Sequence, residues 1–367
     1  MKPARNVLFL DPYHTDSHRV LAEALRDRSR HKVTLLTLPP RKWKWRMRGA
    51  ALVFEPMLRA LPPPPPDALV TTDFLNLPDL LALTRDLFPR PIPCAVYFHE
   101  NQITYPTASS DLRDFHFGLV NIHSALCADR VLFNSGYHRQ EFLGAVEDLI
   151  RSMPDCRPAG VAERIRARSE ILGLPLNLAG IDRSRVPRKD PWILWNHRWE
   201  EDREPATFFE AMEALDREAA AGLAPDFRLV VVGRAYRDRP AAFDRARERL
   251  AHRIERWGFV ESRREYLDLV ARCAAVVSTS RHEFFGVSVM EAIYLGCTPV
   301  LPRRLAYPEI TGPDSPFLYD DPSEIPRRVA EAIRTSPDPR VETLAERIRE
   351  NDLPRVVARW DEILDAL

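Results

Sequence analysis

The sequence has few cysteines, no long apolar run and no excess of charge of either sign. Its five cysteines lie far apart without paired spacing, which fits neither a disulfide framework nor a zinc site. The apolar run NVLFL near the N-terminus is short, and no later run approaches the ~20 residues of a membrane-spanning helix. We therefore expect a soluble, cytoplasmic protein that does not enter a membrane.

The charge balance excludes a further class of protein. The 367 residues include 53 Lys and Arg against 53 Asp and Glu, so the formal net charge is zero. Proteins that hold nucleic acid through net charge carry an excess of positive side chains over a whole surface. A polyanion site in this chain must therefore be local.

One segment departs from this balance. Residues 41–48 read RKWKWRMR, with five basic side chains and two tryptophans. If the segment is extended, alternate side chains share a face. One face then holds Trp43, Trp45 and Met47, and the other holds Lys42, Lys44, Arg46 and Arg48. The apolar face would anchor the segment and the basic face would contact phosphates. A solvated basic turn with its tryptophans packed on a core is the alternative.

Short apolar runs alternate with amphipathic helical stretches along the chain. The first series is NVLFL, KVTLLTL, DALVTT, CAVYF, RVLFN and LPLNLAG, and the second is PWILWN, FRLVVVG, ERWGFV, AAVVSTS and CTPVLP. Such alternation is typical of α/β proteins with a parallel sheet covered by helices. We expect two Rossmann-like, doubly wound domains, residues 1–185 and 186–367, with a polar linker at about 182–190. The last helix can pack on its own domain or back on the first.

Residues 278–302, STSRHEFFGVSVMEAIYLGCTPVLP, contain the most informative motif. An expected strand leads through the loop RHEFFG into a helix of residues 287–295. Gly286 allows close approach of a ligand to the backbone, and the first helical N–H groups favour an anion. Glu283 precedes the helix, and Glu291 lies on the order of 7 Å beyond its start. The two carboxylates can therefore contact opposite sides of a diphosphate, as in a nucleotide sugar, although two unrelated surface carboxylates are the alternative.

This motif resembles the E-x7-E signature of retaining nucleotide-sugar glycosyltransferases of the GT-B type. Other stretches resemble the tRNA-queuosine α-mannosyltransferase branch, namely FHENQITYP, VLFNSGYHR, WNHRWEEDREP, HEFFGVSVMEA, RLAYPEI and LLTLPPRKWKWRMRGA. The resemblance spans nearly the whole chain. It implies two Rossmann-like domains that face each other across a cleft. It also implies a hexosyltransferase that moves mannose from GDP-mannose to the cyclopentene-diol of queuosine in tRNA(Asp).

The resemblance places the donor on the second domain. It implies Arg198 and Arg203 as a diphosphate clamp, although the family usually has Lys at position 203. Glu291 is assigned to the ribose hydroxyls and Glu283 to the donor sugar. The other implied donor contacts are Gly233, Phe285, Gly286 and Val287. A solvated charge run is the alternative for the segment WEEDRE that holds Arg203, and a simple turn is the alternative for Gly233.

In the first domain, His99 follows the expected strand CAVYF, and the resemblance places it beside the reacting sugar. His99, Glu283 and Arg198 are the expected catalytic residues. The implied acceptor and tRNA contacts are Ser17, His18, Asn101, Gln102, Lys42, Trp43, Lys44, Trp45, Arg46 and Arg48. The loop after the first strand departs from the family, because Thr15 and Asp16 stand where related sequences carry glycines.

A retaining transfer without a carboxylate nucleophile is usually written as a front-face reaction, in which the leaving diphosphate helps take the acceptor proton. The chain contains no Asp-X-Asp motif, and we expect neither a metal ion nor a cofactor. The expected partners are a nucleotide sugar and tRNA that carries queuosine. Three alternatives remain open: a GT-B enzyme with a lipid or glycan acceptor or another donor, a nucleotide-sugar epimerase, and a catalytically silent RNA-binding protein.

Overall fold

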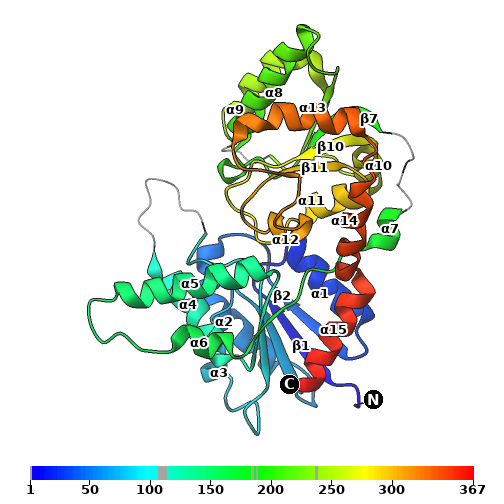
Figure 1. Cartoon of the computed structure of the whole chain (residues 1–367). Helices are drawn as coiled ribbons and strands as arrows, with labels where there is room; N and C mark the ends of the chain where they lie inside the picture. The colour runs from blue at the N-terminus through cyan, green and yellow to red at the C-terminus, as the bar shows by residue number, and fades with distance from the viewer. Residues whose placement is uncertain (1, 106–113, 183–185, 187–188, 236–238) are drawn as a thin grey trace. The chain divides into compact units, whose positions relative to one another are not determined.

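The computed structural model describes residues 2–105, 114–182, 186, 189–235 and 239–367, which form two compact units (Figure 1). The first unit comprises Met1–Pro175 and Leu353–Leu367, and the second comprises Leu176–Asp352. The first unit thus ends before the expected boundary at residue 185, and the C-terminal segment belongs to it. Much of the expected linker at about 182–190 lies outside the described residues.

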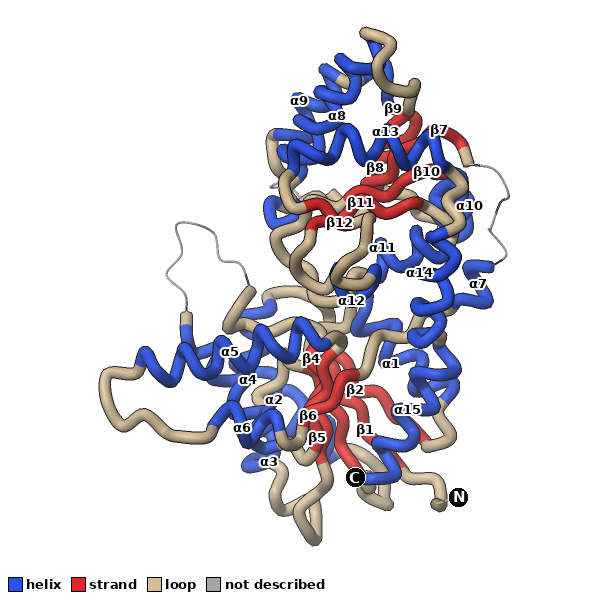
Figure 2. The backbone as a smooth tube through the Cα atoms, viewed as in Figure 1, coloured by secondary structure: helices blue, strands red, loops and turns tan. Residues whose placement is uncertain are grey.

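The first unit is a parallel sheet with helices packed against it (Figure 2). Its strands are β1 (Asn6–Asp11), β2 (Lys32–Thr37), β3 (Ala68–Thr72), β4 (Cys94–Phe98), β5 (Arg130–Phe133) and β6 (Ser169–Ile171). Its helices are α1 (Asp16–Arg28), α2 (Trp43–Arg59), α3 (Leu77–Leu83), α4 (Phe115–Cys127), α5 (Gly136–Ser152), α6 (Val161–Arg166) and α15 (Leu353–Ala366).

The strand order of the first sheet is β2-β1-β3-β4-β5-β6, with every pair parallel. The strands β3 and β4 are buried along their whole length, which explains why neither alternates between apolar and charged residues. The order reverses between β1 and β3, and open parallel sheets bind ligands at the carboxyl edge of such a reversal. The segments that follow β1, β3 and β4 are therefore the places to look for a site in this unit.

Helix α15 packs on α1 in the first unit, and Figure 1 shows the red C-terminal helix beside the blue one. Its buried face includes Val356, Trp360 and Leu364, which are spaced at helical intervals. Asp361 accepts hydrogen bonds from the Ser29 hydroxyl at 2.5 Å and from a backbone amide just after α1. The C-terminal helix is thus part of the core of the first unit.

The second unit repeats the architecture with its own sheet and core. Its strands are β7 (Asp190–Trp195), β8 (Arg228–Val232), β9 (Ile254–Gly258), β10 (Cys273–Val277), β11 (Thr298–Pro302) and β12 (Leu318–Tyr319). Its helices are α7 (Leu178–Asp182), α8 (Pro205–Ala220), α9 (Ala242–Arg249), α10 (Arg263–Arg272), α11 (Val287–Tyr294), α12 (Tyr307–Thr311), α13 (Ile325–Thr335) and α14 (Arg340–Ile348). The sheet order β12-β11-β10-β7-β8-β9 is parallel throughout and reverses between β7 and β10.

One expected strand was wrong. The segment LPLNLAG, residues 174–180, contains only an isolated bridge between Leu176 and Asp352 and the start of α7. The strand that completes the first sheet is β6, a few residues earlier. Pro175 explains the difference, since a proline has no N–H for a ladder hydrogen bond. The alternating leucines are buried without forming a strand.

The expectation for RKWKWRMR was also wrong, because the segment is helical from Trp43 onward. Lys42 precedes the helix in a left-handed conformation, with φ of 56°. The apolar positions that continue after the segment recur at helical spacing and bury Met47, Ala50 and Phe54. Trp43 and Met47 therefore share the inner face of α2, and Trp45 lies on the outer face.

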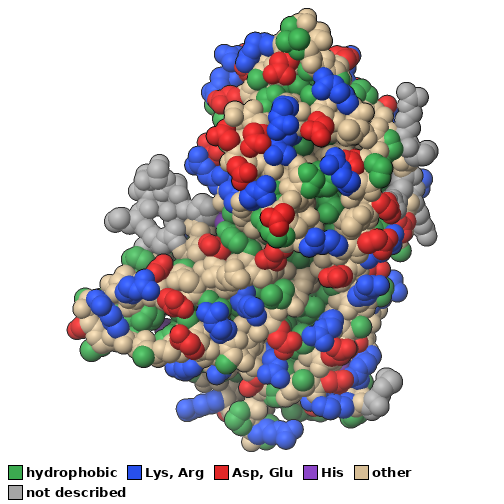
Figure 3. Space-filling model, in the orientation of Figure 1, with side chains coloured by type: hydrophobic (Ala, Val, Ile, Leu, Met, Phe, Trp, Pro, Cys, Tyr) green, Lys and Arg blue, Asp and Glu red, His purple; other side chains and the backbone are tan. Residues whose placement is uncertain are grey.

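The surface is mixed in charge, as the composition implies. On the face shown in Figure 3, Lys and Arg side chains are interspersed with Asp and Glu side chains. Within the described ranges, no helix is long and apolar enough to span a bilayer.

Candidate active site

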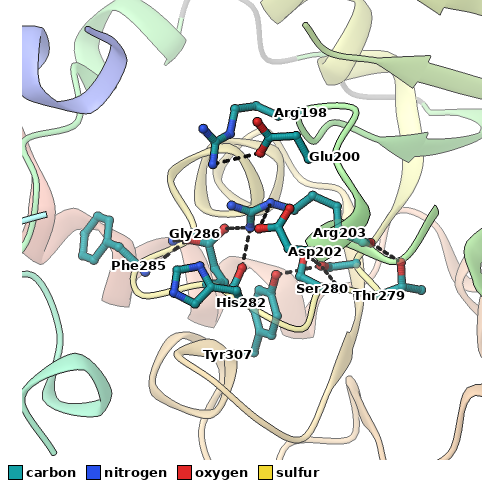
Figure 4. A network of polar contacts seen from close by, with 12 residues as sticks. Arg198, Glu200, Asp202, Arg203, Thr279, Ser280, His282, Phe285, Gly286 and Tyr307 are labelled. Carbon is teal, nitrogen blue, oxygen red and sulfur yellow. Dashed lines mark hydrogen bonds and ion pairs between the residues drawn. The ribbon is translucent and has the colours of Figure 1, made fainter. Parts of the chain in front are cut away.

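The second unit gathers most of the predicted donor-binding residues at the carboxyl edge of its sheet. They come from the segments after β7, β8 and β10, which are Arg198, Arg203, Gly233, Glu283, Phe285 and Gly286. Figure 4 shows part of this group in one polar network. The reversal of strand order between β7 and β10 lies at the same edge, so topology and motif indicate one place.

Arg203 is a nearly buried cation with three partners (Figure 4). Its Nη1 donates to the His282 carbonyl at 2.6 Å and to Glu283 Oε2 at 3.0 Å, and its Nε lies 3.4 Å from a carboxylate oxygen of Asp202. Burial acts to lower the pKa of Arg203, but Glu283 and Asp202 outweigh it and raise the pKa overall. The site therefore holds a fixed positive charge.

Arg198 differs from Arg203 in its exposure. Its side chain is 39% exposed and forms an ion pair with Glu200 at 3.2 Å (Figure 4). The predicted clamp thus consists of one rigid guanidinium and one that solvent reaches. An exposed pair of this kind is worth little to stability, so Arg198 can exchange its partner for an arriving anion at small cost.

Both carboxylate oxygens of Glu283 accept hydrogen bonds, one from its own loop and the other from Arg203. Oε1 accepts from the amides of Phe285 at 3.3 Å and Gly286 at 3.0 Å, and Oε2 accepts from Arg203. The amides of Phe285 and Gly286, two of the implied donor contacts, are thus bonded to Glu283. Val287 begins α11, and its N–H is among those that a helix leaves without an intrahelical acceptor.

Gly286 is required by the local geometry of this loop. Its φ is +87°, and a Cβ there would lie 3.2 Å from Ile310 Cδ1. The glycine allows the chain to turn from the loop of Glu283 directly into α11. The turn brings the loop amides within reach of the carboxylate three residues earlier.

Glu291 lies in the second turn of α11 and is 7% exposed. Arg263, from the start of α10, donates Nη1 to Glu291 Oε2 at 3.0 Å and Nη2 to Oε1. The guanidinium carbon lies 5.3 Å from the centroid of the Tyr266 ring. Each glutamate of the E-x7-E motif is therefore held by its own arginine.

Asn196 follows β7 directly and connects this region to α10 and α11. Its Nδ2 donates to the Tyr266 hydroxyl at 2.9 Å and to the Ser288 carbonyl at 2.9 Å. Its Oδ1 is buried and has no hydrogen-bond partner in the described part of the chain. A buried acceptor without a donor is unusual and marks a place where a ligand donor is favoured.

Gly233 ends β8 where two backbone segments almost touch. A Cβ at this position would lie 1.8 Å from the His197 carbonyl oxygen. The contact is extended by a hydrogen bond from the Trp199 amide to the Arg234 carbonyl at 3.0 Å. The glycine thus permits the strand ends of β7 and β8 to approach each other, which places it beside the predicted clamp.

Two buried histidines in this unit stay neutral. Burial first, and then Arg203, lowers the pKa of both His197 and His282 to about 3. Neither imidazole therefore adds positive charge to the site at neutral pH. The positive charges described at this edge are those of the arginines.

The first unit has a second polar cluster, centred on Asp11 at the end of β1. Its fully buried carboxylate accepts from His14 Nδ1 at 2.8 Å, His18 Nδ1 at 3.0 Å and the Thr72 hydroxyl at 3.3 Å. Burial acts to raise the pKa of Asp11, but His18 and the hydrogen bonds from both histidines hold it well below its usual range. Asp11 is therefore a permanent buried anion.

His99 lies at the end of β4 and stacks on His18. Burial, and then the neighbouring His18, holds the pKa of His99 well below its usual range. Its Nδ1 is 3.4 Å from the Ser17 hydroxyl, and its Nε2 is buried without a partner in the described ranges. Asp73 accepts the His99 backbone amide at 2.9 Å through Oδ1, and burial raises the pKa of this carboxyl.

The remaining acceptor residues predicted in this unit play different parts. Asn101 is fully buried, and its Oδ1 accepts from the Ile103 amide and from both the amide and the hydroxyl of Thr104, so it holds a turn. Gln102 donates to Glu100 at 2.8 Å beside His99. The structure thus brings Ser17, His18, His99 and Gln102 to one edge, and gives Asn101 a structural role there.

The start of α2 adjoins this cluster through aromatic contacts. Trp43 packs on Phe117 at 5.0 Å and on Phe74 at 6.4 Å between ring centroids, and Phe74 in turn contacts His18 at 5.7 Å. Trp45 points outward and is 74% exposed. The predicted tRNA-binding segment therefore lies next to the His18 and His99 pair within the same unit.

The basic side chains of α2 have few strong partners. Lys42 and Lys44 are exposed, and Lys44 lies 5.7 Å from the Trp43 ring centroid. Arg46 donates to the Pro39 carbonyl at 3.3 Å, and Arg48 forms an ion pair with Asp114 at 2.6 Å. The two lysines therefore contribute accessible positive charge at this helix end.

The structure adds five residues that the sequence did not indicate. They are Asp11, Asp73, Asn196, Arg263 and Tyr266. Asp11 and Asp73 follow directly after an expected strand and Asn196 ends one, where polar side chains reach the carboxyl edge of a parallel sheet, so this position was a usable signal. Arg263 and Tyr266 are ordinary residues of an amphipathic helix and gave none. Among the described residues, no group of three or more His, Cys, Asp or Glu side chains is placed to hold a metal ion.

The fold is that of a GT-B glycosyltransferase. Similar solved structures cover nearly the whole chain: the trehalose-6-phosphate phosphatase N-terminal domain of Candida albicans (TM-score 0.72, 12% identity, 100% of this chain and 97% of that one) and Anabaena HepE in complex with UDP and glucose (0.65, 14%, 99% and 100%). Sucrose-phosphate synthase from Thermosynechococcus elongatus is a third (0.67, 16%, 99% and 99%). At these identities the likeness shows the fold alone.

Sequence comparison identifies the family. The model described as tRNA-queuosine alpha-mannosyltransferase N-terminal matches residues 6–176, and the model described as glycosyl transferases group 1 matches residues 181–351. A tRNA-queuosine alpha-mannosyltransferase of Drosophila melanogaster is 33% identical over 321 residues, which are 83% of this chain and 81% of that protein. The chain belongs to the tRNA-queuosine alpha-mannosyltransferase family and is a hexosyltransferase, which confirms the expected fold and family.

Proposed function

We propose that this chain transfers mannose from GDP-mannose to the cyclopentene-diol of queuosine in tRNA(Asp), with retention of anomeric configuration. The observation that carries the proposal is the 33% identity to the fruit-fly tRNA-queuosine alpha-mannosyltransferase over 83% of the chain. The arginine–glutamate pairs of the second unit support it, because they keep the E-x7-E motif ordered. The free thiols of all five cysteines favour a reducing cytoplasm as its compartment.

The donor would bind to the second unit through charge. Arg203 supplies a buried guanidinium and Arg198 a partly exposed one, so both can neutralise a diphosphate as it leaves. Glu291 would accept hydrogen bonds from the ribose hydroxyls, and Glu283 would position the donor sugar. With these charges supplied by the protein, the reaction needs no metal ion or cofactor.

The first unit would supply the acceptor side. His99 is held neutral, and its buried Nε2 is available to hydrogen-bond a sugar or acceptor hydroxyl. His18 stacks on it and is fixed by Asp11. Positioning of the reacting hydroxyl in this way can contribute a large share of the rate, because it replaces a bimolecular encounter with a bound geometry.

The deciding experiment is mass spectrometry of tRNA nucleosides after incubation with a panel of sugar nucleotides. We expect a mass gain of one hexose on queuosine with GDP-mannose, and none on tRNA prepared without queuosine. Transfer to tRNA from another donor would correct the donor alone. Transfer to a lipid or glycan and never to tRNA would reject the proposal in favour of a GT-B enzyme with that acceptor.

The tRNA backbone would contact the start of α2 through Lys42 and Lys44. Each phosphate contact steepens the dependence of binding on salt concentration. We expect the double variant Lys42→Ala with Lys44→Ala to bind tRNA more weakly, with a flatter salt slope and unchanged GDP binding. The matched control is Arg28→Ala with Lys32→Ala, which removes the same charge from exposed positions elsewhere in this unit. An equal change of slope in both variants would leave α2 without a specific role.

A further inference from the structure

We infer that Arg263 is a positioning residue for donor binding, which holds the Glu291 carboxylate in the orientation that receives the ribose hydroxyls. The inference rests on the donor role proposed above for Glu291. Arg263 lies 28 residues before Glu291 and outside the E-x7-E motif. It acts on the ribose through another side chain, so it is a positioning residue and does not touch the substrate itself.

The geometry of the pair leaves room for a ligand. Arg263 donates one N–H to each oxygen of Glu291, as a bidentate fork. An ionised carboxylate has about four acceptor positions. The fork uses two of them, one on each oxygen, and it fixes the plane in which the other two lie. Each oxygen keeps one acceptor position that points away from the fork, and a ribose hydroxyl can donate to it.

The Arg263 guanidinium also lies against the ring of Tyr266. Arg263 and Tyr266 are three residues apart on α10, so their side chains share a face, and the guanidinium carbon lies 5.3 Å from the ring centroid. The Tyr266 hydroxyl accepts from Asn196, which also donates to the Ser288 carbonyl at the start of α11. This chain of contacts connects α10 to the helix that carries Glu291. The arginine, the tyrosine and the asparagine thus form one support for the carboxylate.

The exposure of the two partners separates this role from a purely structural one. The Glu291 side chain is 9% exposed, whereas the Arg263 side chain is 56% exposed. A buried carboxylate depends on its partner, but an arginine that reaches in from the surface contributes little to the core. The main consequence of losing Arg263 should therefore be a misplaced Glu291 carboxylate.

The test compares nucleotides with and without the ribose hydroxyls. Calorimetry gives the dissociation constants of GDP and 2′,3′-dideoxy-GDP, with UDP and 2′,3′-dideoxy-UDP in parallel so that the base does not decide the outcome. We expect wild type to prefer the ribose nucleotide, and Arg263→Gln to lose that preference by about tenfold, as Glu291→Gln does. Arg263→Lys should restore part of it, because Lys supplies the charge without the fork.

Arg264→Gln is the matched control, because Arg264 is the next residue of α10 and its side chain is 90% exposed. It should keep the preference of wild type. The preference is the ratio of two dissociation constants, so a lower fraction of folded protein does not change it. Thermal unfolding of each variant reports stability separately.

The possible outcomes test the role of Arg263 separately from the donor role proposed for Glu291. If Glu291→Gln loses the ribose preference while Arg263→Gln keeps it, the positioning role is overturned and the donor site stands. If Arg263→Gln weakens all nucleotides equally, the arginine is a structural ion pair and the inference again fails. If Glu291→Gln itself keeps the preference, the donor role proposed for Glu291 is wrong and the inference falls with it.

Discussion

The imidazole rings of His18 and His99 stack with their centroids 3.8 Å apart and their planes 18° from parallel. Asp11 accepts a hydrogen bond from Nδ1 of His18. Burial acts to lower the pKa of His18, but Asp11 outweighs it and raises the pKa overall. The pKa of His99 moves the other way, lowered by burial and by His18. The cluster therefore shifts the pKa values of the two stacked rings in opposite directions.

Replacing Asp11 with Asn should make stability depend on pH in a defined way. The raised pKa of His18 contributes stability that is present below its ordinary value of 6.5 and is lost as pH rises through the folded value. The lowered pKa of Asp11 contributes stability that is present above 3.8 and is lost as pH falls through the folded value. The difference between wild type and Asp11→Asn is thus largest between these two pH values.

We expect the difference to reach about 3 kcal/mol there, since the change leaves a buried charge unpaired. Urea unfolding at pH 5 and pH 9 measures it. Asp27→Asn, which removes an exposed carboxylate from α1, is the control and should change little at either pH. A difference that is the same at both pH values would show that the ion pair is not the cause.

Arg203 should be replaceable by Lys but not by Gln. Its charge is what offsets Glu283 and Asp202, and a lysine keeps that charge. Arg203→Gln leaves the two carboxylates without a cation, so we expect kcat/KM to fall by about 100-fold and stability to fall with it. Steady-state kinetics and thermal unfolding of both variants test this. If both variants lose the same activity and stability, the hydrogen bonds of the Arg203 guanidinium, including the one to the His282 carbonyl, are more important than its charge.

The fold of both units could be predicted because strand alternation and glycine placement are local signals. The E-x7-E glutamates could be placed for the same reason. Arg263 could not, since its bond to Glu291 joins two helices far apart in the sequence and depends on where the fold places them, which no local pattern records. The α2 segment was misread because eight residues fit a period of two, whereas the burial of Ala50 and Phe54 beyond them sets a helical period. Packing in the folded chain therefore determines both the partner of Arg263 and the conformation of the α2 segment.

Gly233 should tolerate no side chain. A Cβ would overlap the His197 carbonyl oxygen, and backbone cannot move aside as a flexible side chain does. We expect Gly233→Ala to lower the unfolding temperature and weaken donor binding together. Gly49→Ala is the contrasting variant, because that glycine lies inside α2 with no atom within 4 Å of the added Cβ. It should stabilise the protein by about 0.5–1 kcal/mol. A stable Gly233→Ala variant would contradict the close approach of the two strand ends.

Activity should persist in EDTA. If Arg198 and Arg203 hold the diphosphate as proposed, their guanidinium groups supply the positive charge that a bound cation supplies in a metal-dependent enzyme. Transfer measured with EDTA present should therefore equal transfer measured with added Mg²⁺. The control is a known metal-dependent glycosyltransferase assayed in the same buffers. Loss of turnover that only Mg²⁺ or Mn²⁺ restores would overturn the proposal of a metal-independent reaction.

Trp43 and Trp45 should separate stability from tRNA binding. Trp43 packs inward on Phe74 and Phe117, so Trp43→Ala should destabilise the first unit by about 3 kcal/mol. Trp45 is 74% exposed on the outer face of α2, so Trp45→Ala should leave the unfolding temperature unchanged. If Trp45 stacks on an unpaired base, its loss should weaken tRNA binding by about 1–3 kcal/mol.

Thermal unfolding and tRNA titration at fixed salt measure the two effects on the same preparations. Leu52→Ala is the control, because Leu52 is 68% exposed on the same outer face of α2 but has no aromatic ring. It should change neither quantity by much. If Trp45→Ala and Leu52→Ala weaken tRNA binding equally, the contact is general apolar contact with the helix. If neither does, the outer face of α2 does not meet tRNA, and the aromatic part of RKWKWRMR serves only to anchor the helix through Trp43.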